Sequence, residues 1–403
     1  MNYDLLFVVI FGLVVLGLML INRKRTELQK IAFPFLYMII YRTKLGLKNM
    51  DRLAAKHPKS LNVLSYISIF TGYLGMAFII FFLFKGLYDV LFFSAPSPVG
   101  LVLPGIQIAP NIPILSFWHW IIAIFILASV HEFSHGVFAR LNKIKVKSSG
   151  FAFLGILLPI IPAAFVEPDE KDMEKASKKA QISVLAAGSF ANFLTALVVF
   201  FIMMAVAVPI GTHFIDQPYE IVIKGIDDGG PLDLAGVTVG EKISGVNGVE
   251  VTTLEEIFNV LNETSPSQII PLTTDKKEYS IKLTENPRDE SKGYLGVQIG
   301  QTCSLMDYKG CQNFKSSAYG WIYQLLWWLF LINLGVGMFN LLPLGILDGG
   351  KMFYLATLYF TKSEVSAKKI FKYANIILIL VLLFLILPSL YNSLISPLIS
   401  FII

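Results

Sequence analysis

Long apolar runs, rather than short alternating or helical patterns, dominate this chain. Six of them have about the 20 residues that a helix needs to cross a bilayer, where every backbone polar group must be satisfied within the segment. They are Leu5 to Ile21, Leu61 to Phe84, Ile114 to Arg140, Ile182 to Ile210, Ala318 to Leu341 and Tyr373 to Leu394. The pattern predicts a polytopic α-helical membrane protein with about six transmembrane helices. No basic region precedes the first run, so we interpret it as a retained anchor rather than a secretory signal.

Two shorter apolar stretches are too short for the same interpretation. The stretch from Phe151 to Val166 contains Pro159 and Pro162, which favours a re-entrant or interfacial element over a spanning helix. The stretch from Ile31 to Tyr41 sits in a strongly basic loop. We expect it to lie on the membrane surface.

Composition and charge agree with a membrane setting. Hydrophobic residues make up 55% of the chain and charged residues 15%, against roughly 45 to 50% and about 25% in soluble domains. Lys and Arg gather between Arg23 and Lys59, between Arg140 and Lys147, and between Lys362 and Lys372, so the positive-inside bias places these three regions in the cytoplasm. Both termini and residues 212–317 then lie outside. The net charge of +5 thus reflects the membrane topology. The sequence has no cluster of basic and aromatic residues that would predict nucleic-acid binding.

The long outside segment predicts a small α+β domain. Between Tyr219 and Gly300, β-rich runs alternate with two short helices, at Pro231 to Ala235 and Leu254 to Leu261. The letters VNGV supply the Asn-Gly pair of a type I′ hairpin turn. The run GGPLDLAGVTVGEKISGVNGVEV resembles the PDZ domains of membrane and envelope proteases, and GYLGV, Gly293 to Val297, resembles their carboxylate-binding loop. A small β-rich domain without a peptide site is the alternative.

The two cysteines, Cys303 and Cys311, fall just after this domain on the predicted outside. An oxidising compartment would allow a disulfide that closes a short loop. The alternative is two free thiols. Thiol labelling under non-reducing conditions distinguishes the two, because a disulfide protects both cysteines from the label.

Residues 131 to 135, HEFSH, place two histidines and a glutamate at the end of a run without charged residues. On an α-helix, His131 and His135 lie one turn apart on one face and can hold a single Zn²⁺. Glu132, beside the first ligand, can act as general base toward a zinc-bound water. An ionisable group at bilayer depth costs at least about 2.5 kcal/mol, so it is usually paired, hydrated or functional. The alternative is that the helix ends here and Glu132 reaches the cytoplasmic interface beside Arg140.

A third zinc ligand is expected, because catalytic zinc sites usually have three protein ligands and leave the fourth position to water. Asp348 follows a charge-free stretch and closes NLLPLGILDGG, whose single proline and three glycines indicate a break in the helix. The predicted topology brings Asp348 to the same depth as HEFSH. The alternative is an ordinary loop aspartate after a helix.

These motifs in this order resemble the site-2 protease family of intramembrane zinc metalloproteases, peptidase family M50, over residues 114 to about 360. The resemblance implies a core of three helices around one Zn²⁺ per chain, with His131, His135 and Asp348 as ligands and Glu132 as catalytic base. It implies that Phe151 to Val166 forms a membrane-associated β-hairpin or re-entrant loop near the substrate. Two asparagines also carry over. Asn192, in GSFAN, corresponds to a catalytic donor to the oxyanion or the substrate backbone, and Asn340 corresponds to a substrate-binding residue. Asn192 could equally bond between closely packed helices.

The resemblance implies cleavage of transmembrane segments of other membrane proteins near the cytoplasmic side of the bilayer, in regulated intramembrane proteolysis, with peptide or C-terminus binding by the outside domain. Two other classes stay open, a silent membrane scaffold and a transporter that uses Glu132 and Asp348 as a proton relay. We expect five regions: 1–113, N-terminal transmembrane helices and basic loop; 114–211, first half of the protease core; 212–317, PDZ-like domain; 318–360, second half of the core; 361–403, C-terminal transmembrane helix.

Overall fold

A computed structural model of the chain describes residues 3–22, 26–32, 36–93, 95–100, 102–105, 112–156, 158–214, 220–287, 289–301 and 314–390. It divides into two compact units. The first comprises Met1–Phe201 and Leu325–Ile403, and the second comprises Ile202–Gln324. Each unit is described by itself below.

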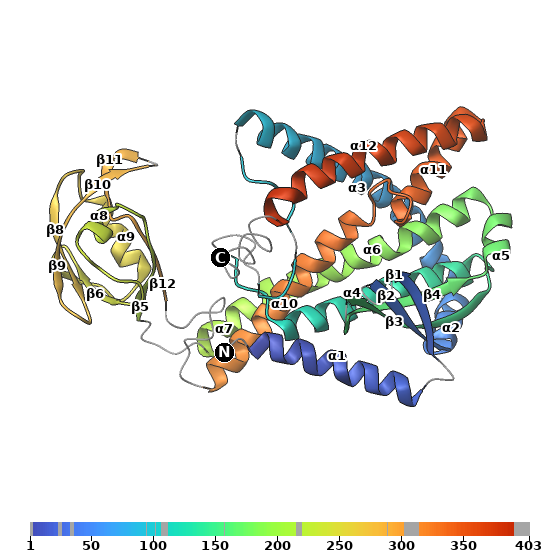
Figure 1. Cartoon of the computed structure of the whole chain (residues 1–403), viewed down its shortest axis with the longest axis horizontal. Helices are drawn as coiled ribbons and strands as arrows, with labels where there is room; N and C mark the ends of the chain where they lie inside the picture. The colour runs from blue at the N-terminus through green and yellow to red at the C-terminus, as the bar shows by residue number, and fades with distance from the viewer. Residues whose placement is uncertain are drawn as a thin grey trace. The chain divides into compact units, whose positions relative to one another are not determined.

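Long apolar helices make up most of the first unit (Figure 1). Five helices are long and apolar enough to cross a membrane. They are α3 (Pro58–Phe93), α4 (Phe117–Leu141), α6 (Lys178–Ile202) with its continuation to Gly211, α10 (Phe314–Phe339) and α12 (Glu364–Leu390). The sixth predicted span is a helix, α1 (Tyr3–Ile21), but its apolar part is only Leu6–Ile21. At 1.5 Å per residue that part covers about 24 Å, less than the roughly 30 Å of a bilayer core.

Large hydrophobic side chains lie on the outer faces of these helices. Phe70, Phe81 and Phe92 on α3 expose 66%, 64% and 70% of their surface, and Leu380 on α12 exposes 61%. A soluble surface rarely presents so much contiguous apolar area. The outer faces therefore suit contact with lipid.

A four-stranded antiparallel sheet packs among these helices, in the order β1-β2-β3-β4. Its strands are β1 (Thr26–Ala32), β2 (Leu36–Thr43), β3 (Val146–Ile156) and β4 (Leu158–Pro168). The stretch Phe151 to Val166 is thus a β-hairpin. The described residues of the stretch Ile31 to Tyr41, which is expected on the membrane surface, belong to β1 and β2, and Tyr37 pairs with Gly155 of β3. Backbone pairing within the sheet satisfies these strands, and their position at the membrane surface stays a prediction.

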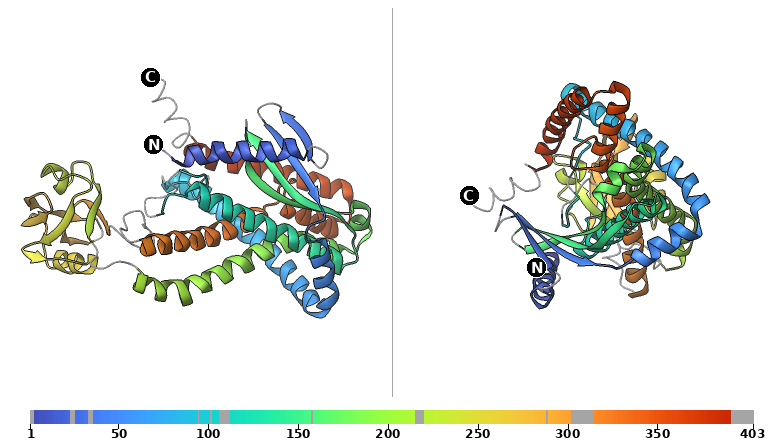
Figure 2. Two further views of the ribbon diagram at one scale, coloured as in Figure 1. Left: turned by 90° about the horizontal axis from the view of Figure 1, so that it is seen from below. Right: turned by 90° about the vertical axis from the view of Figure 1, so that its right-hand side faces the viewer.

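The sheet lies beside α4, and β4 runs along this helix (Figure 2). Helix α1 packs against the sheet. Val15 and Met19 of α1 form a buried cluster with Tyr37 and Ile39 of β2. The short helix α2 (Leu47–Lys56) packs Met50 onto α4, where Gly136 leaves room for its sulfur. Strand β4, at one edge of the sheet, is therefore held next to the HEFSH segment of α4.

Helix α3 packs against the segment that joins α10 to α11 (Asp348–Thr361). A Cβ atom on Gly75 would lie 2.5 Å from Leu341 Cδ1, and one on Gly72 would lie 2.8 Å from Met352 Cε. The Tyr73 hydroxyl donates a hydrogen bond to the Met352 carbonyl oxygen at 3.2 Å. Helix α3 thus supports the segment around Asp348 through close contacts on both sides of it.

The second unit has a sheet with the strand order β12-β5-β6-β8-β9, and β7 pairs with β6. The two helices expected there are present, α8 (Pro231–Leu234) and α9 (Leu254–Asn262). Asn247 and Gly248 have φ of 53° and 77°, the left-handed backbone that a type I′ turn needs. The strands are β5 (Ile221–Ile226), β6 (Lys242–Val246), β7 (Val249–Glu250), β8 (Ile269–Thr274), β9 (Glu278–Lys282) and β12 (Val297–Gln301), with a separate hairpin of β10 (Thr284–Asn286) and β11 (Asp289–Tyr294). Cys303 and Cys311 lie outside the described residues, so the disulfide stays a hypothesis.

Candidate metal centre

Helix α4 carries both histidines of HEFSH on one face. Ser116 caps its N-terminus through a hydrogen bond from the His119 backbone N–H, and the helix continues without a break to Leu141. The His131 and His135 rings are 4.7 Å apart between centroids, and the residues are only 7% and 8% exposed. The predicted spacing therefore places two buried imidazoles side by side.

Asp348 is the first residue of α11, directly after the helix break that Pro343 and the neighbouring glycines predicted. A carboxylate in the first turn of a helix is favoured by the helix dipole. A Cβ atom on Gly349 or Gly350 would collide with the backbone of Leu341 or Leu344, so only glycine lets the preceding loop fold back onto this turn. The Gly349 N–H donates to the Asn340 carbonyl oxygen at 2.8 Å, which closes the loop.

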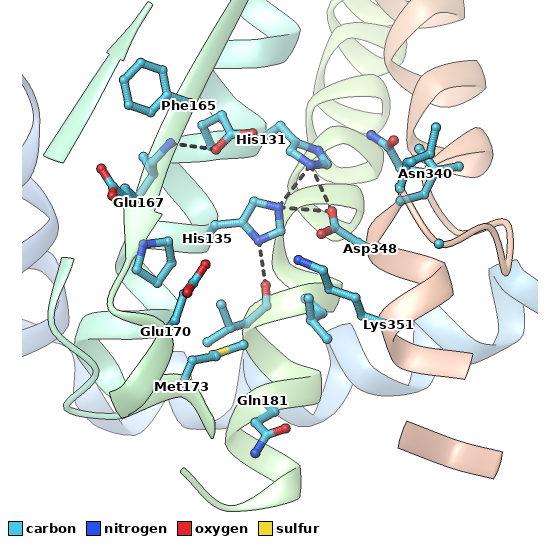
Figure 3. Close-up of a pocket in the computed structure, with 18 of the residues that line it drawn as sticks. His131, His135, Phe165, Glu167, Glu170, Met173, Gln181, Asn340, Asp348 and Lys351 are labelled. Carbon is cyan, nitrogen blue, oxygen red and sulfur yellow. Dashed lines mark hydrogen bonds and ion pairs between the residues drawn. The ribbon is translucent and has the colours of Figure 1, made fainter. Parts of the chain in front are cut away.

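The three predicted ligand atoms converge (Figure 3). Asp348 Oδ2 lies 3.2 Å from His131 Nε2 and 3.1 Å from His135 Nε2, and the two Nε2 atoms are 3.0 Å apart. Tetrahedral zinc with bonds of about 2.0 to 2.1 Å separates its ligand atoms by roughly 3.3 Å. The observed spacing therefore fits the donor set of a zinc site.

Gly188 of α6 provides the space for these rings. A Cβ atom on Gly188 would lie 2.5 Å from His131 Nε2 and 2.5 Å from His135 Nε2. Real Cβ atoms are essentially never so close to another heavy atom. The absence of a side chain at this position leaves a cradle in which the two ligand nitrogens can meet a metal ion.

The far nitrogen of each imidazole also has a partner. His135 Nδ1 lies 2.7 Å from the Val184 carbonyl oxygen on α6. His131 Nδ1 lies 3.1 Å from Nδ2 of Asn192, which is on α6 and fully buried. Metal-binding histidines usually have such a partner, which fixes the ring and its tautomer. Sequence reasoning missed Val184, because the group that acts is its backbone carbonyl oxygen, which no side chain marks.

Glu132 turns toward the sheet rather than toward solvent. Its Oε2 accepts a hydrogen bond from the Val166 N–H of β4 at 2.8 Å. Arg140, the expected neighbour in the alternative interpretation, pairs with Asp51 instead, at 2.9 Å. Glu132 therefore sits at the edge of β4, one residue from the first ligand.

A cavity of about 1330 Å³ opens onto the three ligand residues, and Glu132 and Asn340 also line it. The Asn340 amide has no hydrogen-bond partner among the described residues. Lys351, which sequence reasoning missed, lines the cavity one helical turn after Asp348 (Figure 3). Its spacing of three residues from a predicted ligand could have indicated it. The described residues that line this cavity do not include Asn192.

Known proteins are similar to this chain in sequence. The sequence profile of Peptidase family M50 matches residues 119–385, well over half of the chain. An uncharacterized protein of Methanocaldococcus jannaschii is 29% identical over 319 residues, which is 77% of this chain and 75% of that protein.

Two relatives with named activities match over shorter regions. Zinc metalloprotease RasP of Geobacillus kaustophilus is 25% identical over 43% of this chain and 49% of its own length. Regulator of sigma E protease of Salmonella typhi is 32% identical over 30% of this chain and 26% of its own length. The chain thus spans about half of the first of these two proteins and about a quarter of the second.

Proposed function

The chain belongs to peptidase family M50, the site-2 protease family, and is a zinc metalloprotease; from that premise we propose that it hydrolyses transmembrane segments of other membrane proteins, with one Zn²⁺ held by His131, His135 and Asp348. The observation that carries the proposal is the convergence of three ligand atoms within 3.0 to 3.2 Å of one another, although His131 and Asp348 are 217 residues apart in the chain. The apolar helices around the site point to a substrate that lies in the membrane.

Glu132 is the proposed general base. Its carboxylate takes a proton from the attacking water and passes it to the nitrogen of the leaving amine, which a peptide bond needs in order to break. When bound, Zn²⁺ supplies the Lewis acidity that makes a water nucleophilic at neutral pH and polarises the scissile carbonyl. The Val166 N–H holds the Glu132 carboxylate at 2.8 Å, so the base is oriented before substrate arrives.

The substrate is proposed to bind as an extended strand between β4 and the loop before Asp348. A helical peptide bond is shielded by its own hydrogen bonds, so the substrate helix must unwind near the site. The Asn340 amide lines the cavity with no partner among the described residues and can bond the substrate backbone. Ile346, which lines the same cavity, is 91% exposed and can contact an apolar side chain.

The second unit is proposed to act as a PDZ-like domain that selects substrates by size or by a freshly cut C-terminus. Strand β12 begins at the last residue of GYLGV, whose loop connects it to β11, and forms one end of the strand order β12-β5-β6-β8-β9. Gly296 in this loop has φ of 67° and packs against Gly230 and Pro231 at the start of α8. An edge strand beside such a loop is the arrangement by which PDZ domains add a peptide to their sheet. We propose that this unit lies outside the cell and that the metal centre opens toward the cytoplasm.

Purified wild type and Glu132→Gln, each in detergent, test the proposal by metal analysis and by cleavage of a transmembrane substrate. We expect about one zinc per chain in both proteins and cleavage by the wild type alone. Glu250→Gln, at an exposed position of the second unit, should cleave like the wild type. A folded wild type without zinc would contradict the proposal and favour a scaffold. Proton-coupled transport by a protein that cleaves nothing would favour the transporter.

A further inference from the structure

The two ligand histidines must present the same ring nitrogen to a metal ion. Nε2 of each ring faces the other ligands, so each Nε2 must offer its lone pair and each Nδ1 must carry the proton. For His135 the structure meets this requirement directly. The Val184 carbonyl oxygen, 2.7 Å from Nδ1, can only accept a hydrogen bond, so Nδ1 is the donor.

By the same requirement, His131 needs a hydrogen-bond acceptor next to its Nδ1. The group in that place is the Asn192 amide, 3.1 Å from Nδ1 and fully buried. Asn192 Oδ1 has no hydrogen-bond partner. A buried amide oxygen without a partner costs roughly 1 to 3 kcal/mol.

Exchange of the amide oxygen and nitrogen gives the Nδ1 proton of His131 an acceptor, and it moves the unpartnered position of the amide from Oδ1 to Nδ2. The two orientations of an amide have the same shape and differ only in which atom faces the ring. With Oδ1 facing Nδ1, the amide accepts the imidazole proton and the otherwise unpartnered oxygen gains its bond. This orientation is the one compatible with a metal ion on Nε2.

We propose that Asn192 is a positioning residue for His131: its Oδ1 accepts the proton of Nδ1 and thereby holds Nε2 toward the zinc. The inference rests on the proposed zinc site. It differs from the donor role expected from the sequence, in which the amide nitrogen bonds the oxyanion or the substrate backbone. Asn192 does not line the described part of the cavity, whereas Asn340 does, so its contacts place it behind the ligand rather than in front of the substrate.

Zinc affinity separates the two roles, measured by competition with a chelator on the full chain in detergent. Asn192→Leu removes the acceptor, and we expect zinc binding about 10 to 100-fold weaker. Asn192→Asp keeps an acceptor but has no donor, and we expect zinc affinity within about three-fold of the wild type or tighter. A donor to the substrate predicts the reverse pattern: unchanged zinc affinity in both variants and loss of cleavage in Asn192→Asp.

A second readout is the tautomer of His131, from nitrogen NMR of ¹⁵N-histidine-labelled protein without metal. Nδ1 should carry the proton in the wild type and in Asn192→Asp, and this preference should be lost in Asn192→Leu. If leucine prevents folding, Asn192→Ser removes the contact without added bulk. Asn333→Leu is the matched control, because Asn333 is a fully buried amide on α10 that bonds Leu329 of its own helix.

Failure of the inference is distinguishable from failure of the proposed function. A wild type that binds zinc and cleaves, together with folded Asn192→Leu and Asn192→Ser variants whose zinc affinity stays within three-fold, would overturn the role of Asn192 alone. A folded wild type that binds no zinc would overturn the proposed function. Weaker binding in the leucine variant with recovery in the aspartate variant supports both.

Discussion

Gly188 faces both ligand imidazoles, and its replacement gives a sharp prediction at the scale of single residues. In an ordinary helix, Gly→Ala stabilises a protein by about 0.4 to 1 kcal/mol when the backbone allows it. In Gly188→Ala the new Cβ atom would lie 2.5 Å from two ligand nitrogens, so the rings must move. We expect zinc affinity to fall about 100-fold and cleavage to be lost, as measured by metal competition and a substrate assay.

Gly335 on α10 offers the matched substitution. A Cβ atom there would have nothing within 4 Å, so Gly335→Ala should leave zinc binding unchanged. Equal behaviour of the two alanine variants would mean that Gly188 does not make room for the metal ligands.

The sequence predicted which residues meet at the centre but not how they are oriented. His131 and His135 follow from helical spacing, and Asp348 follows from a lone charge at a helix break. The contacts from Glu132 to Val166 and from His131 to Asn192 depend on how distant segments align. No local pattern encodes that alignment, so these partners could only come from the structure.

Among the elements, α3 supports the loop that carries Asp348. Leucine at position 75 would drive its side chain into Leu341, where even a Cβ atom lies 2.5 Å from Cδ1. Overpacking of this kind costs typically 1 to 3 kcal/mol. For Gly75→Leu we expect a lower thermal midpoint and about ten-fold weaker zinc binding, because the loop must shift and Asp348 with it.

The control variant for Gly75→Leu is Gly17→Leu on α1, where a Cβ atom would have nothing within 4 Å. This variant should keep the midpoint and the zinc affinity of the wild type. Wild-type zinc affinity in a folded Gly75→Leu protein would show that α3 does not position Asp348.

The long helices were accessible from the sequence, and the hairpin of β3 and β4 was one of two forms that the family resemblance implied, whereas β1 and β2 were not predicted. Apolar runs and proline positions give local signals. Strand β2 pairs with β3 more than a hundred residues away, as between Tyr37 and Gly155. Because the polar β1 has no clear alternation and its partners are distant, the apolar run in β2 favoured a surface element instead.

On the scale of the whole molecule, the second unit has its own pH-dependent stability. Burial opposes ionisation of Glu241, but hydrogen bonds from Thr238, Thr274 and Tyr279 outweigh it and lower the pKa of this carboxyl from 4.5 to about 2. Stability from Glu241 is thus complete above pH 4.5 and is lost as the pH falls toward 2.

Glu241→Gln should therefore destabilise this unit at pH 7 by about 2 to 4 kcal/mol, because hydrogen bonds to a charged group are lost. The difference from the wild type should shrink at pH 3. Pulse proteolysis of the full chain across a urea series measures both, with trypsin at pH 7 and pepsin at pH 3. Exposed Glu250→Gln should match the wild type at both values. A Glu241→Gln difference that does not change with pH would contradict the assignment.

The membrane topology is testable with cysteines introduced after Cys303 and Cys311 have been replaced by serine. A cysteine in place of the exposed Glu285 of the second unit should react with an impermeant maleimide on intact cells. One in place of the exposed Lys369, at the start of α12, should react only after the membrane is opened. The opposite labelling pattern would reverse the proposed sidedness.

The distance of 217 residues between His131 and Asp348 also has a consequence for synthesis of the protein. At about 5 to 20 residues per second, a ribosome adds Asp348 roughly 10 to 40 s after His131. During that interval the nascent chain holds the HEFSH helix and the inserted second unit, but it lacks a complete set of metal ligands. If the proposed zinc site is correct, the protease gains its third ligand only late in its synthesis, and a chain that ends within the second unit should bind zinc weakly and cleave nothing.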